Sequence, residues 1–283
     1  MNRTILIADA GSTGTQWCAV SCDGTRRYFS GGPVNPAVFS PETIGETLRA
    51  ALSDVDTSEC GCVAFYGAGC RPGKLSEIVA EQLRQLLPEG CEIAVNSDML
   101  GAARAACGNS AGIACILGTG SNSCLYDGSA IIDAVPSLGY ILGDEGSGAY
   151  LGRKLINAIY KRQLSKEICH SFEDFTGLNI DGIIERVYRQ PQPNTFLASC
   201  APFLAQNIDD DSIRAIVEEA FTDFIEQNIV RYENSHHYPL NFVGSIACYF
   251  NTTLQAVAEK SGYKTGRCIK SPLEGLIEYH TND

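Results

Sequence analysis

The sequence predicts an α/β protein made of two related halves, and three observations support this prediction. Apolar runs of strand length alternate with longer stretches of helical periodicity. An apolar strand followed by a turn of glycine and hydroxyl residues occurs at 4–15, and the same pattern returns at 113–122. Such internal similarity indicates two related structural units. The chain has 283 residues, 45% of them hydrophobic, which is enough for one large or two medium domains.

The first half opens with a strand at 4–8 that leads into Asp9 and the turn 10–15. The apolar pattern resumes at 16–20, which predicts a hairpin, and 26–30 adds a third strand. The turn lacks the Gly-Lys-Ser/Thr of a Walker loop, and it does not open a helix as a dinucleotide fingerprint does. We expect the turn to hold phosphate and Asp9 to bind metal-bound water; a turn-forming carboxylate is the alternative for Asp9.

The rest of the first half alternates helices and strands. Asn35 lies in a loop with two prolines, where asparagine most often forms a turn. The elements that we expect next are a helix at 41–55 with Ser40 as its N-cap, a strand at 62–66, a helix at 73–87, a strand at 92–95 and a helix at 99–107. Asp98 is either the N-cap of that last helix or a functional carboxylate at the C-terminal end of a strand, where α/β proteins bind ligands.

The second half begins after a linker of small residues at 108–112. The strand 113–117 runs into the turn 118–122, which is rich in hydroxyl and amide groups, and a strand returns at 123–126. Taken alone, this turn fits a plain hairpin. Its likeness to 4–15 favours a second phosphate-binding turn, since glycines let the backbone approach a ligand closely. Two such turns facing each other would hold one nucleotide.

A glycine-rich stretch at 139–148 contains the adjacent carboxylates Asp144 and Glu145. A disordered acidic loop is one interpretation, but Ile141 and Leu142 favour packing against the protein. The elements expected after it are a helix capped by Ser147 and ending near 163, mostly helical structure at 165–240 with an amphipathic helix at 211–232, a strand at 240–243, a helix at 247–260, a strand at 267–270 and a final helix at 271–280. His236 and His237 are interpreted as surface residues.

Charge and cysteine content limit the function classes. A net charge of −12 argues against nucleic acid or an anionic membrane as the main partner, although ATP is compatible because phosphate sites are built locally. The 13 cysteines contain no C-x-x-C pair, and no secretory leader opens the chain, so we expect reduced thiols in a cytoplasmic protein. The number of cysteines leaves a metal cluster open, while their spacing does not suggest one. No apolar stretch is long enough to span a bilayer.

Five motifs in order resemble the sugar kinase, hexokinase and actin-like superfamily. They are DAGSTGT at 9–15, NSDMLGA at 96–102, GTGSN at 118–122, GYILGDEGSGAYLG at 139–152 and VGS at 243–245. Within the superfamily, the chain is similar to the BadF/BadG/BcrA/BcrD ATPase group, which includes N-acetylglucosamine kinases. The resemblance implies two ribonuclease H-like (actin-like ATPase) domains around a cleft. One would comprise 1–107 with a returning helix at 271–283, and the other 108–270.

The resemblance also implies a role for each matching residue. It makes Asp98 the catalytic base, and Asp9 the residue that organises Mg²⁺. The implied ATP contacts are Gly11, Ser12 and Thr13 at the outer phosphates, Gly118, Thr119 and Gly120 in the second phosphate turn, and Gly244 and Ser245 beside the adenosine. The implied sugar contacts are Asn35, Ser121, Asn122, Gly139, Tyr140 and Asp144. Tyr140 stands where the animal N-acetylglucosamine kinase has tryptophan, and Val34 and Pro36 also differ, so the sugar stays open.

The sequence therefore predicts an ATP-dependent kinase that phosphorylates N-acetylglucosamine or N-acetylmuramic acid at the 6-hydroxyl, with glucosamine as an alternative substrate. Its partner would be the small-molecule sugar, with no nucleic acid and no membrane, and a homodimer is open. The runner-up is an ATPase activator of a 2-hydroxyacyl-CoA dehydratase-type enzyme, a class that shares the nucleotide cleft but carries an iron–sulfur cluster. A nucleotide-binding regulator without catalysis is the third hypothesis.

Overall fold

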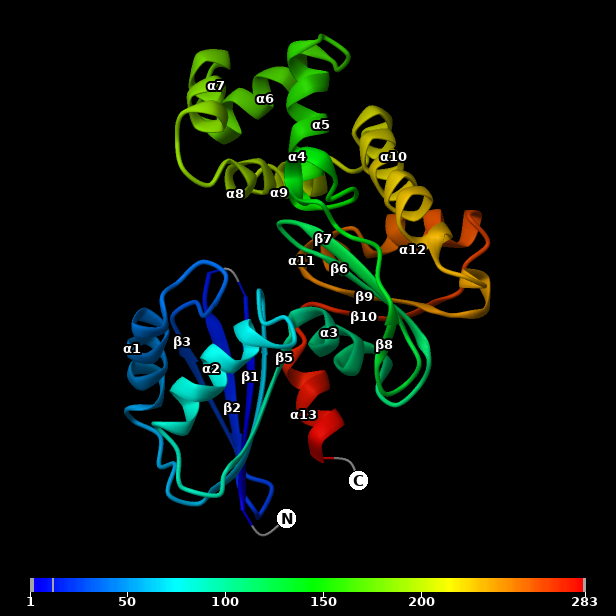
Figure 1. The fold of residues 1–283 in the computed structure, drawn as a ribbon. Coiled ribbons are helices and arrows are strands. Elements are labelled where there is room, and N and C mark those ends of the chain that lie inside the picture. The colour runs from blue at the N-terminus through cyan, green and yellow to red at the C-terminus, as the bar shows by residue number, and fades with distance from the viewer. Residues whose placement is uncertain (1–2, 12, 282–283) are drawn as a thin grey trace. The chain divides into compact units, whose positions relative to one another are not determined.

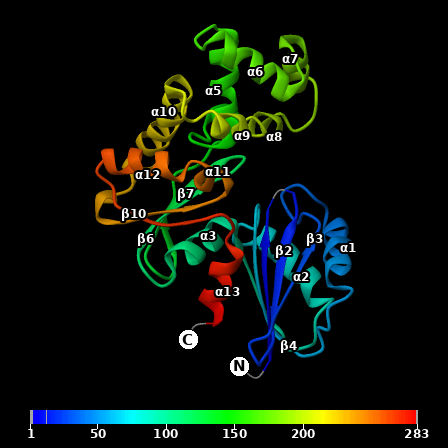
Figure 2. The same cartoon turned by 180° about the vertical axis from the view of Figure 1, so that it is seen from behind.

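The computed structural model describes residues 3–11 and 13–281, which divide into two compact units (Figure 1; Figure 2 shows the reverse side). Unit 1 comprises Met1–Asn109 and Pro272–Asp283, and unit 2 comprises Ser110–Ser271. The expected domain boundaries, 107/108 and 270/271, lie close to these divisions. Each unit has a sheet and a hydrophobic core of its own.

Unit 1 is built on a five-stranded sheet with the strand order β3-β2-β1-β4-β5. Its strands are β1 (Thr4–Ala10), β2 (Thr15–Val20), β3 (Arg26–Gly31), β4 (Cys60–Gly67) and β5 (Glu92–Ser97). The first three strands form an antiparallel meander, whereas β4 and β5 run parallel to β1. The C-terminal ends of β1, β4 and β5 therefore lie at the same edge of the sheet, which we call the unit 1 edge.

Helices cover both faces of this sheet. Because side chains alternate along a strand, Phe65 and Tyr66 of β4 point to opposite faces. Phe65 belongs to the core under α1 (Pro41–Leu52) and α2 (Lys74–Arg84). Tyr66 packs toward α3 (Asp98–Cys107) and α13 (Leu273–Thr281). The helix of 272–283 thus returns to the sheet formed by the start of the chain.

A buried polar cluster fixes α13 against α3 and β4. The Tyr66 hydroxyl lies 2.8 Å from Nε2 of His280, and Arg104 of α3 donates to the same hydroxyl at 2.8 Å. Burial and, to a smaller extent, the positive charge of Arg104 lower the pKa of His280 to about 4, so its ring is neutral at neutral pH. Gly275 allows α13 to approach closely, because a Cβ there would lie 2.3 Å from the carbonyl oxygen of Ala105.

Unit 2 repeats the sheet of unit 1. The strand order is β10-β9-β6-β7-β8, with strands β6 (Gly112–Leu117), β7 (Ser121–Tyr126), β8 (Ile131–Asp133), β9 (Leu240–Val243) and β10 (Thr265–Ile269). An antiparallel meander of β6, β7 and β8 is again followed by two strands parallel to the first, β9 and β10. The predicted likeness of the two halves is confirmed, and β8 is a strand that the sequence did not reveal.

Helices make up most of unit 2 between β8 and β9, as predicted. They are α4 (Gly139–Leu142), α5 (Gly148–Tyr160), α6 (Lys166–Thr176), α7 (Ile180–Tyr188), α8 (Pro193–Ala198), α9 (Ala201–Gln206), α10 (Asp211–Gln227) and the 3-10 helices η1 (Ile229–Arg231) and η2 (Ser235–His237). The single helix expected after β9 is two helices, α11 (Ser245–Tyr249) and α12 (Asn251–Lys260). His236 and His237 are exposed, as predicted.

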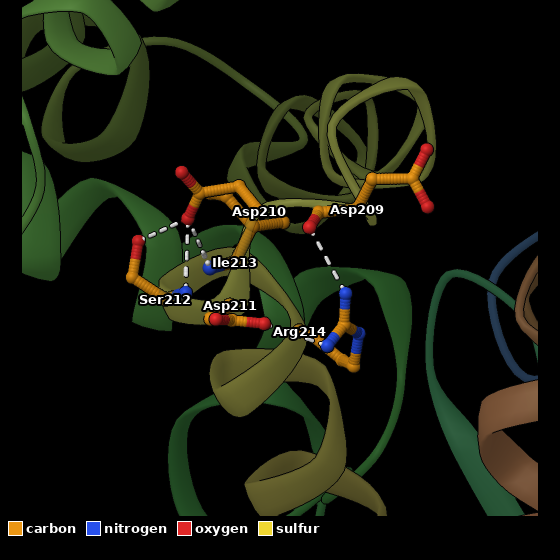
Figure 3. A network of polar contacts seen from close by, with 6 residues as sticks. All are labelled: Asp209, Asp210, Asp211, Ser212, Ile213 and Arg214. Atoms are coloured by element: carbon orange, nitrogen blue, oxygen red, sulfur yellow. Dashed lines mark hydrogen bonds and ion pairs between the residues drawn. The ribbon is translucent and has the colours of Figure 1, made fainter.

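The start of α10 at residue 211 agrees with the sequence, and Figure 3 shows why it begins there. The Asp210 side chain accepts hydrogen bonds from the backbone N–H groups of Ser212 (2.9 Å) and Ile213 (3.2 Å). These are N–H groups that a helix start leaves without an intrahelical partner. Arg214 pairs with Asp211 at 2.8 Å and donates to the Asp209 carbonyl at 2.9 Å (Figure 3).

The expectation that Ile141 and Leu142 pack into the protein is wrong. They lie in the single turn of α4, and their side chains are 67% and 74% exposed. An apolar pair in a glycine-rich stretch does not specify which side faces the core, because a helix of one turn has too few positions to show a periodic face.

We expect Gly275→Val to lower the free energy of unfolding by about 2 kcal/mol or more, because its side chain would push α13 off the backbone of α3. Equilibrium urea denaturation measures this change. The matched control is Glu46→Val on the exposed face of α1, which should cost less than about 1 kcal/mol. Equal unfolding midpoints for the two variants would contradict this account of the helix contact.

Candidate functional site

Two carboxylates occupy the unit 1 edge. Asp9 is near the end of β1, and Asp98 is the first residue of α3, directly after β5. The N-cap of α3 is Ser97, whose hydroxyl accepts from the N–H of Leu100 at 3.2 Å, so the alternative that Asp98 is the cap is wrong. One oxygen of Asp98 accepts from the N–H of Met99 at 2.9 Å. Its second oxygen has no hydrogen-bond partner among the residues that the structure describes.

The surroundings of these carboxylates favour their protonated forms. Burial, and then the negative charge of Asp98, raise the pKa of Asp9 to about 6 from its ordinary value of 3.8. Burial also raises the pKa of Asp98, although the N–H of Met99 and the positive charge of Arg71 act in the opposite direction. Both carboxyl groups are partly buried, and the charge of Asp98 adds to the cost of ionising Asp9. Perturbed carboxyl groups of this kind concentrate at functional sites.

A divalent cation fits this pair. The Asp9 carboxylate accepts no hydrogen bond from any described residue, so its oxygens are available as ligands, and a cation would offset the repulsion from Asp98. Mg²⁺ prefers oxygen ligands and is commonly bound by one or two carboxylates together with water and phosphate oxygens. The described residues include no group of three or more His, Cys, Asp or Glu side chains that could hold a metal ion.

Three further sequence-predicted residues belong to this edge. Gly11 follows β1, and its N–H donates to the carbonyl of Gly14 at 2.9 Å, which closes the hairpin turn. Thr13 is exposed in that turn, whereas Ser12 lies outside the described residues. Asn35 takes the predicted turn role, because its side-chain oxygen accepts from the N–H of Ala37 at 3.0 Å.

The turn after β4 joins this group, and the sequence prediction missed it. Gly69 has a φ of +77°, and a Cβ there would lie 2.1 Å from the side-chain oxygen of Asn35, so only glycine fits beside Asn35. The N–H of Ala68 donates to the carbonyl of Ala10 at 3.0 Å, which ties this turn to the end of β1. Arg71 follows the turn and places a positive charge near Asp98. The sequence pattern that could have identified this turn is Gly67 and Gly69 at the end of a strand, followed two residues later by the positively charged Arg71.

In unit 2, the turn Gly118-Thr119-Gly120 is bonded to the start of α5. The carbonyls of Gly118 and Thr119 accept from the N–H groups of Gly148 (2.8 Å) and Ala149 (3.1 Å) at the start of α5. Within the described part of the chain, the N–H groups of Thr119 and Gly120 have no acceptor. Backbone N–H groups gathered beside a helix N-terminus suit a phosphate.

The turn after β9 lies against the turn after β6. Gly244 has a φ of +126°, and a Cβ there would lie 2.2 Å from the carbonyl oxygen of Leu117 and 3.3 Å from the nitrogen of Gly118. Ser245 begins α11 directly after it. The structure thus brings the two predicted nucleotide segments of unit 2 into contact, and glycine is needed at 244 for this approach.

The predicted sugar contacts of unit 2 also gather here. Asp144 is buried and has a φ of +55°, and a Cβ on Gly120 would lie 2.8 Å from its carboxylate. Burial raises the pKa of Asp144, while a hydrogen bond from the N–H of Ser121 opposes this. Asn122 is the next residue of β7, and its side-chain oxygen accepts from the N–H of Ser123 at 2.9 Å. Four predicted residues, 120–122 and 144, are therefore neighbours.

Gly139 and Tyr140 form the first half of α4. Gly139 is exposed with a φ of +76°, and Tyr140 is half-buried. Tyr140 lines a pocket between α4, α5, α7 and α8. None of the hydrogen bonds between described residues links Tyr140 to Asp144.

The 13 cysteines are all free thiols. Burial is the main cause that raises the pKa of Cys60, Cys70 and Cys200 to about 12, so these thiols stay protonated and act as small apolar groups. The structure brings Cys60 within 3.7 Å of Cys91, and Cys248 within 3.9 Å of Cys268, pairs that sequence spacing did not suggest. Among the described residues, no helix combines the length and apolar character needed to cross a membrane.

The pKa of Asp9, and its dependence on Asp98, can be measured. The folded-state pKa of Asp9 lies above 3.8, so its contribution to the free energy of unfolding falls as the pH rises from about 4 to about 6. We expect the Asp9 carboxyl to titrate near pH 6 by ¹³C NMR. In Asp98→Asn the midpoint should fall but stay above 3.8, because burial is the larger cause. Asp54→Asn, at an exposed position, is the control and should leave it unchanged.

Comparison with known proteins gives matches among solved structures only: no protein-family profile and no curated protein matches the chain. A structure from Porphyromonas gingivalis, described as a "putative N-acetylglucosamine kinase", is 45% identical, covers 99% of each chain and has a TM-score of 0.92. One from Chromobacterium violaceum with the same description is 20% identical over 98% of each chain, with a TM-score of 0.71.

A ROK family glucokinase from Streptomyces griseus, solved with glucose and AMPPNP, is 14% identical over 98% of this chain and 97% of its own, with a TM-score of 0.53. At 20% and 14% identity, the Chromobacterium violaceum and Streptomyces griseus structures are evidence of the fold alone. This fold agrees with the predicted fold class, an α/β protein of the actin-like ATPase type. With 45% identity over almost the whole of both chains, the protein belongs to the N-acetylglucosamine kinase-like family of the Porphyromonas gingivalis structure.

Proposed function

We propose that the protein is an ATP-dependent kinase that phosphorylates an N-acetylated amino sugar at its 6-hydroxyl, with N-acetylglucosamine or N-acetylmuramic acid as substrate. The partly buried pair of Asp9 and Asp98 at the unit 1 edge carries the proposal, because it offers a cation ligand and a base near each other. Full-length identity of 45% to a protein described as a kinase of this class supports it. Within the superfamily, we assign the chain to the BadF/BadG/BcrA/BcrD group on its five motifs.

Asp98 acts as the general base in this proposal. Its second carboxylate oxygen has no described hydrogen-bond partner and can accept the proton of the attacking sugar hydroxyl. Burial raises its pKa, which makes the carboxylate a stronger base, while the N–H of Met99 and the positive charge of Arg71 stabilise its ionised form. A positioned base of this kind contributes roughly 10²–10⁴ in rate.

Backbone N–H groups hold the nucleotide. Thr119 and Gly120 offer N–H groups to phosphate oxygens. Gly11, Ser12 and Thr13 are assigned to the outer phosphates because they match the family motif. Gly244 and Ser245 border the adenosine. Asp9 would hold Mg²⁺, and the chemistry supplied by the bound ion would be neutralisation of negative charge on the transferred phosphoryl group. Phosphoryl transfer depends mostly on such positioning and charge neutralisation.

Sugar recognition is assigned to the residues that match the sugar contacts of the family, which are Asn35, Ser121, Asn122, Gly139, Tyr140 and Asp144. The Asp144 carboxylate accepts a hydrogen bond from the N–H of Ser121. Its remaining oxygen accepts a hydrogen bond from a sugar hydroxyl. A site built from buried polar groups discriminates strongly, because an analogue that lacks the matching hydroxyl leaves them unpaired. The units 1–107 with 271–283 and 108–270 serve as the two actin-like domains, and the protein works in the cytoplasm as a monomer or homodimer.

We expect Asp98→Asn to lower sugar-dependent ADP release by at least about 10²-fold, because the amide cannot accept the hydroxyl proton. Calorimetry should show ATP binding within a few-fold of the wild type. The assay is a coupled ADP-release screen over amino sugars, with Asp54→Asn as the control. Full activity of Asp98→Asn would rule out Asp98 as the base. If the wild-type protein turns over no amino sugar, the proposed function is wrong.

A second variant separates sugar binding from chemistry. Asp144→Asn should raise the KM for the sugar about tenfold or more, because a buried charge-assisted hydrogen bond to a hydroxyl is lost. The KM for ATP should change less than about twofold. Initial rates with each substrate varied in turn measure both constants, and Asp174→Asn on the exposed side of α6 is the control. An unchanged sugar KM would show that Asp144 does not contact the substrate.

A further inference from the structure

Unit 2 contains a pocket of about 460 Å³ that none of the nucleotide contacts uses. Its walls come from α4, α5, α7 and α8, and all but two of its lining residues are apolar or aromatic. The two polar residues are Arg153 and Asn157 of α5. Pockets of this size with apolar walls and a few polar groups are typical of small-molecule sites.

Apolar side chains around this pocket remain exposed to water. Ile141 of α4 and Ile184 and Tyr188 of α7 line it, with exposures of 67%, 47% and 76%. Exposed apolar surface gathered around a hollow marks a place where an apolar partner or ligand binds. The exposure of Ile141, which the sequence did not lead us to expect, therefore has a use if a ligand covers it.

The pocket and the proposed set of sugar contacts have one residue in common. Tyr140 is one of the sugar contacts and also lines the pocket. The first N–H groups of α5 bond the Gly118-Thr119 turn, and Arg153 lies five residues after Gly148. With a rise of about 1.5 Å per residue, Arg153 is about 8 Å along the helix from that turn. A substituent on the bound sugar could span this distance.

Arg153 favours a negative charge in the ligand. Its guanidinium lies 4.8 Å from the ring centre of Tyr150, and no carboxylate of the described chain pairs with it. Its neighbour Lys154 differs, since it lies 2.9 Å from Glu219 and 3.4 Å from Asp223. A guanidinium beside an apolar wall binds a carboxylate well, because its planar fork of donors matches the two oxygens.

We propose that this pocket binds a substituent of the amino sugar that joins an apolar portion to a terminal carboxylate, and that it thereby selects the substrate. The proposal rests on the proposed function. The substituent can be attached to the sugar through the amide nitrogen or through a ring oxygen beside it, and the experiment distinguishes these two attachments.

The test compares kcat/KM for matched sugars. N-succinylglucosamine carries the carboxylate on nitrogen, and N-butyrylglucosamine carries the uncharged counterpart at the same position. N-acetylmuramic acid carries the carboxylate on oxygen, and 3-O-isopropyl-N-acetylglucosamine carries the uncharged counterpart there. We expect one carboxylate sugar to exceed its counterpart about tenfold, the size of one charge-assisted contact. The apolar part should add about threefold per buried methylene over N-acetylglucosamine.

Two variants locate the effect in the pocket. Arg153→Gln should abolish the preference for the carboxylate and leave kcat/KM for N-acetylglucosamine within about twofold. Ile184→Asn should reduce the gain from the apolar portion. The controls are Arg231→Gln and Val230→Asn, which lie at exposed positions outside the pocket lining and should keep the wild-type preferences.

Each other outcome has a definite meaning. If N-acetylglucosamine is phosphorylated but neither carboxylate sugar is preferred, the pocket inference is wrong and the proposed function stands. If the preference survives in Arg153→Gln, the assigned pocket is wrong. If Ile184→Asn converts a dimer into a monomer in sedimentation and leaves the sugar preferences intact, the surface is an interface between copies of the chain, which also overturns the proposal. Loss of every sugar activity in the wild type would instead reject the proposed function.

Discussion

Two partly buried carboxyl groups, Asp9 and Asp98, determine the electrostatics of the unit 1 edge. Asp9 lies near the end of β1 and Asp98 follows β5, and the parallel arrangement of β1, β4 and β5 brings them to one edge. Neither is ionised at low cost without a nearby positive charge, because water is largely excluded and the carboxylates repel each other. The fold thus stores an unfavourable interaction that a bound cation relieves. Within the chain, the positive charge of Arg71 partly stabilises the ionised form of Asp98.

The candidate site of unit 2 is formed mainly by backbone groups of turns, whereas that of unit 1 is formed mainly by two carboxyl groups. The start of α5 takes up the carbonyls of the turn 118–119, which leaves N–H groups of that turn for a ligand. Gly244 brings the turn after β9 against the same place, and Asp144 is held next to Gly120. The two sheets share one topology, but the residues at their edges have diverged. Unit 2 alone has the long helical insertion whose α4 and α7 line the apolar pocket.

Much of the fold could be predicted because the signals are local. The apolar strands at 4–8 and 113–117, the glycine turns after them and the start of α10 all depend on residues close in sequence. Asp98 shows the limit, since Ser97 and Asp98 can both cap a helix and only the backbone course decides between them. Ile141 and Leu142 show another, because a four-residue helix has no periodic face. Gly69 and Arg71 were missed because their importance depends on Asn35 and Asp98, which are distant in sequence.

The sequence by itself determined the element order, the repeated strand-turn-strand unit and the residue types that phosphoryl transfer needs, because these follow from periodicity, turn chemistry and side-chain functional groups. Only the tertiary structure decided which of these groups share an environment. It raised the pKa of Asp9 through burial and Asp98, paired Asp144 with Ser121, and left the apolar residues of α4 beside Arg153. Burial and electrostatic interaction act through space, so no local pattern along the chain encodes them.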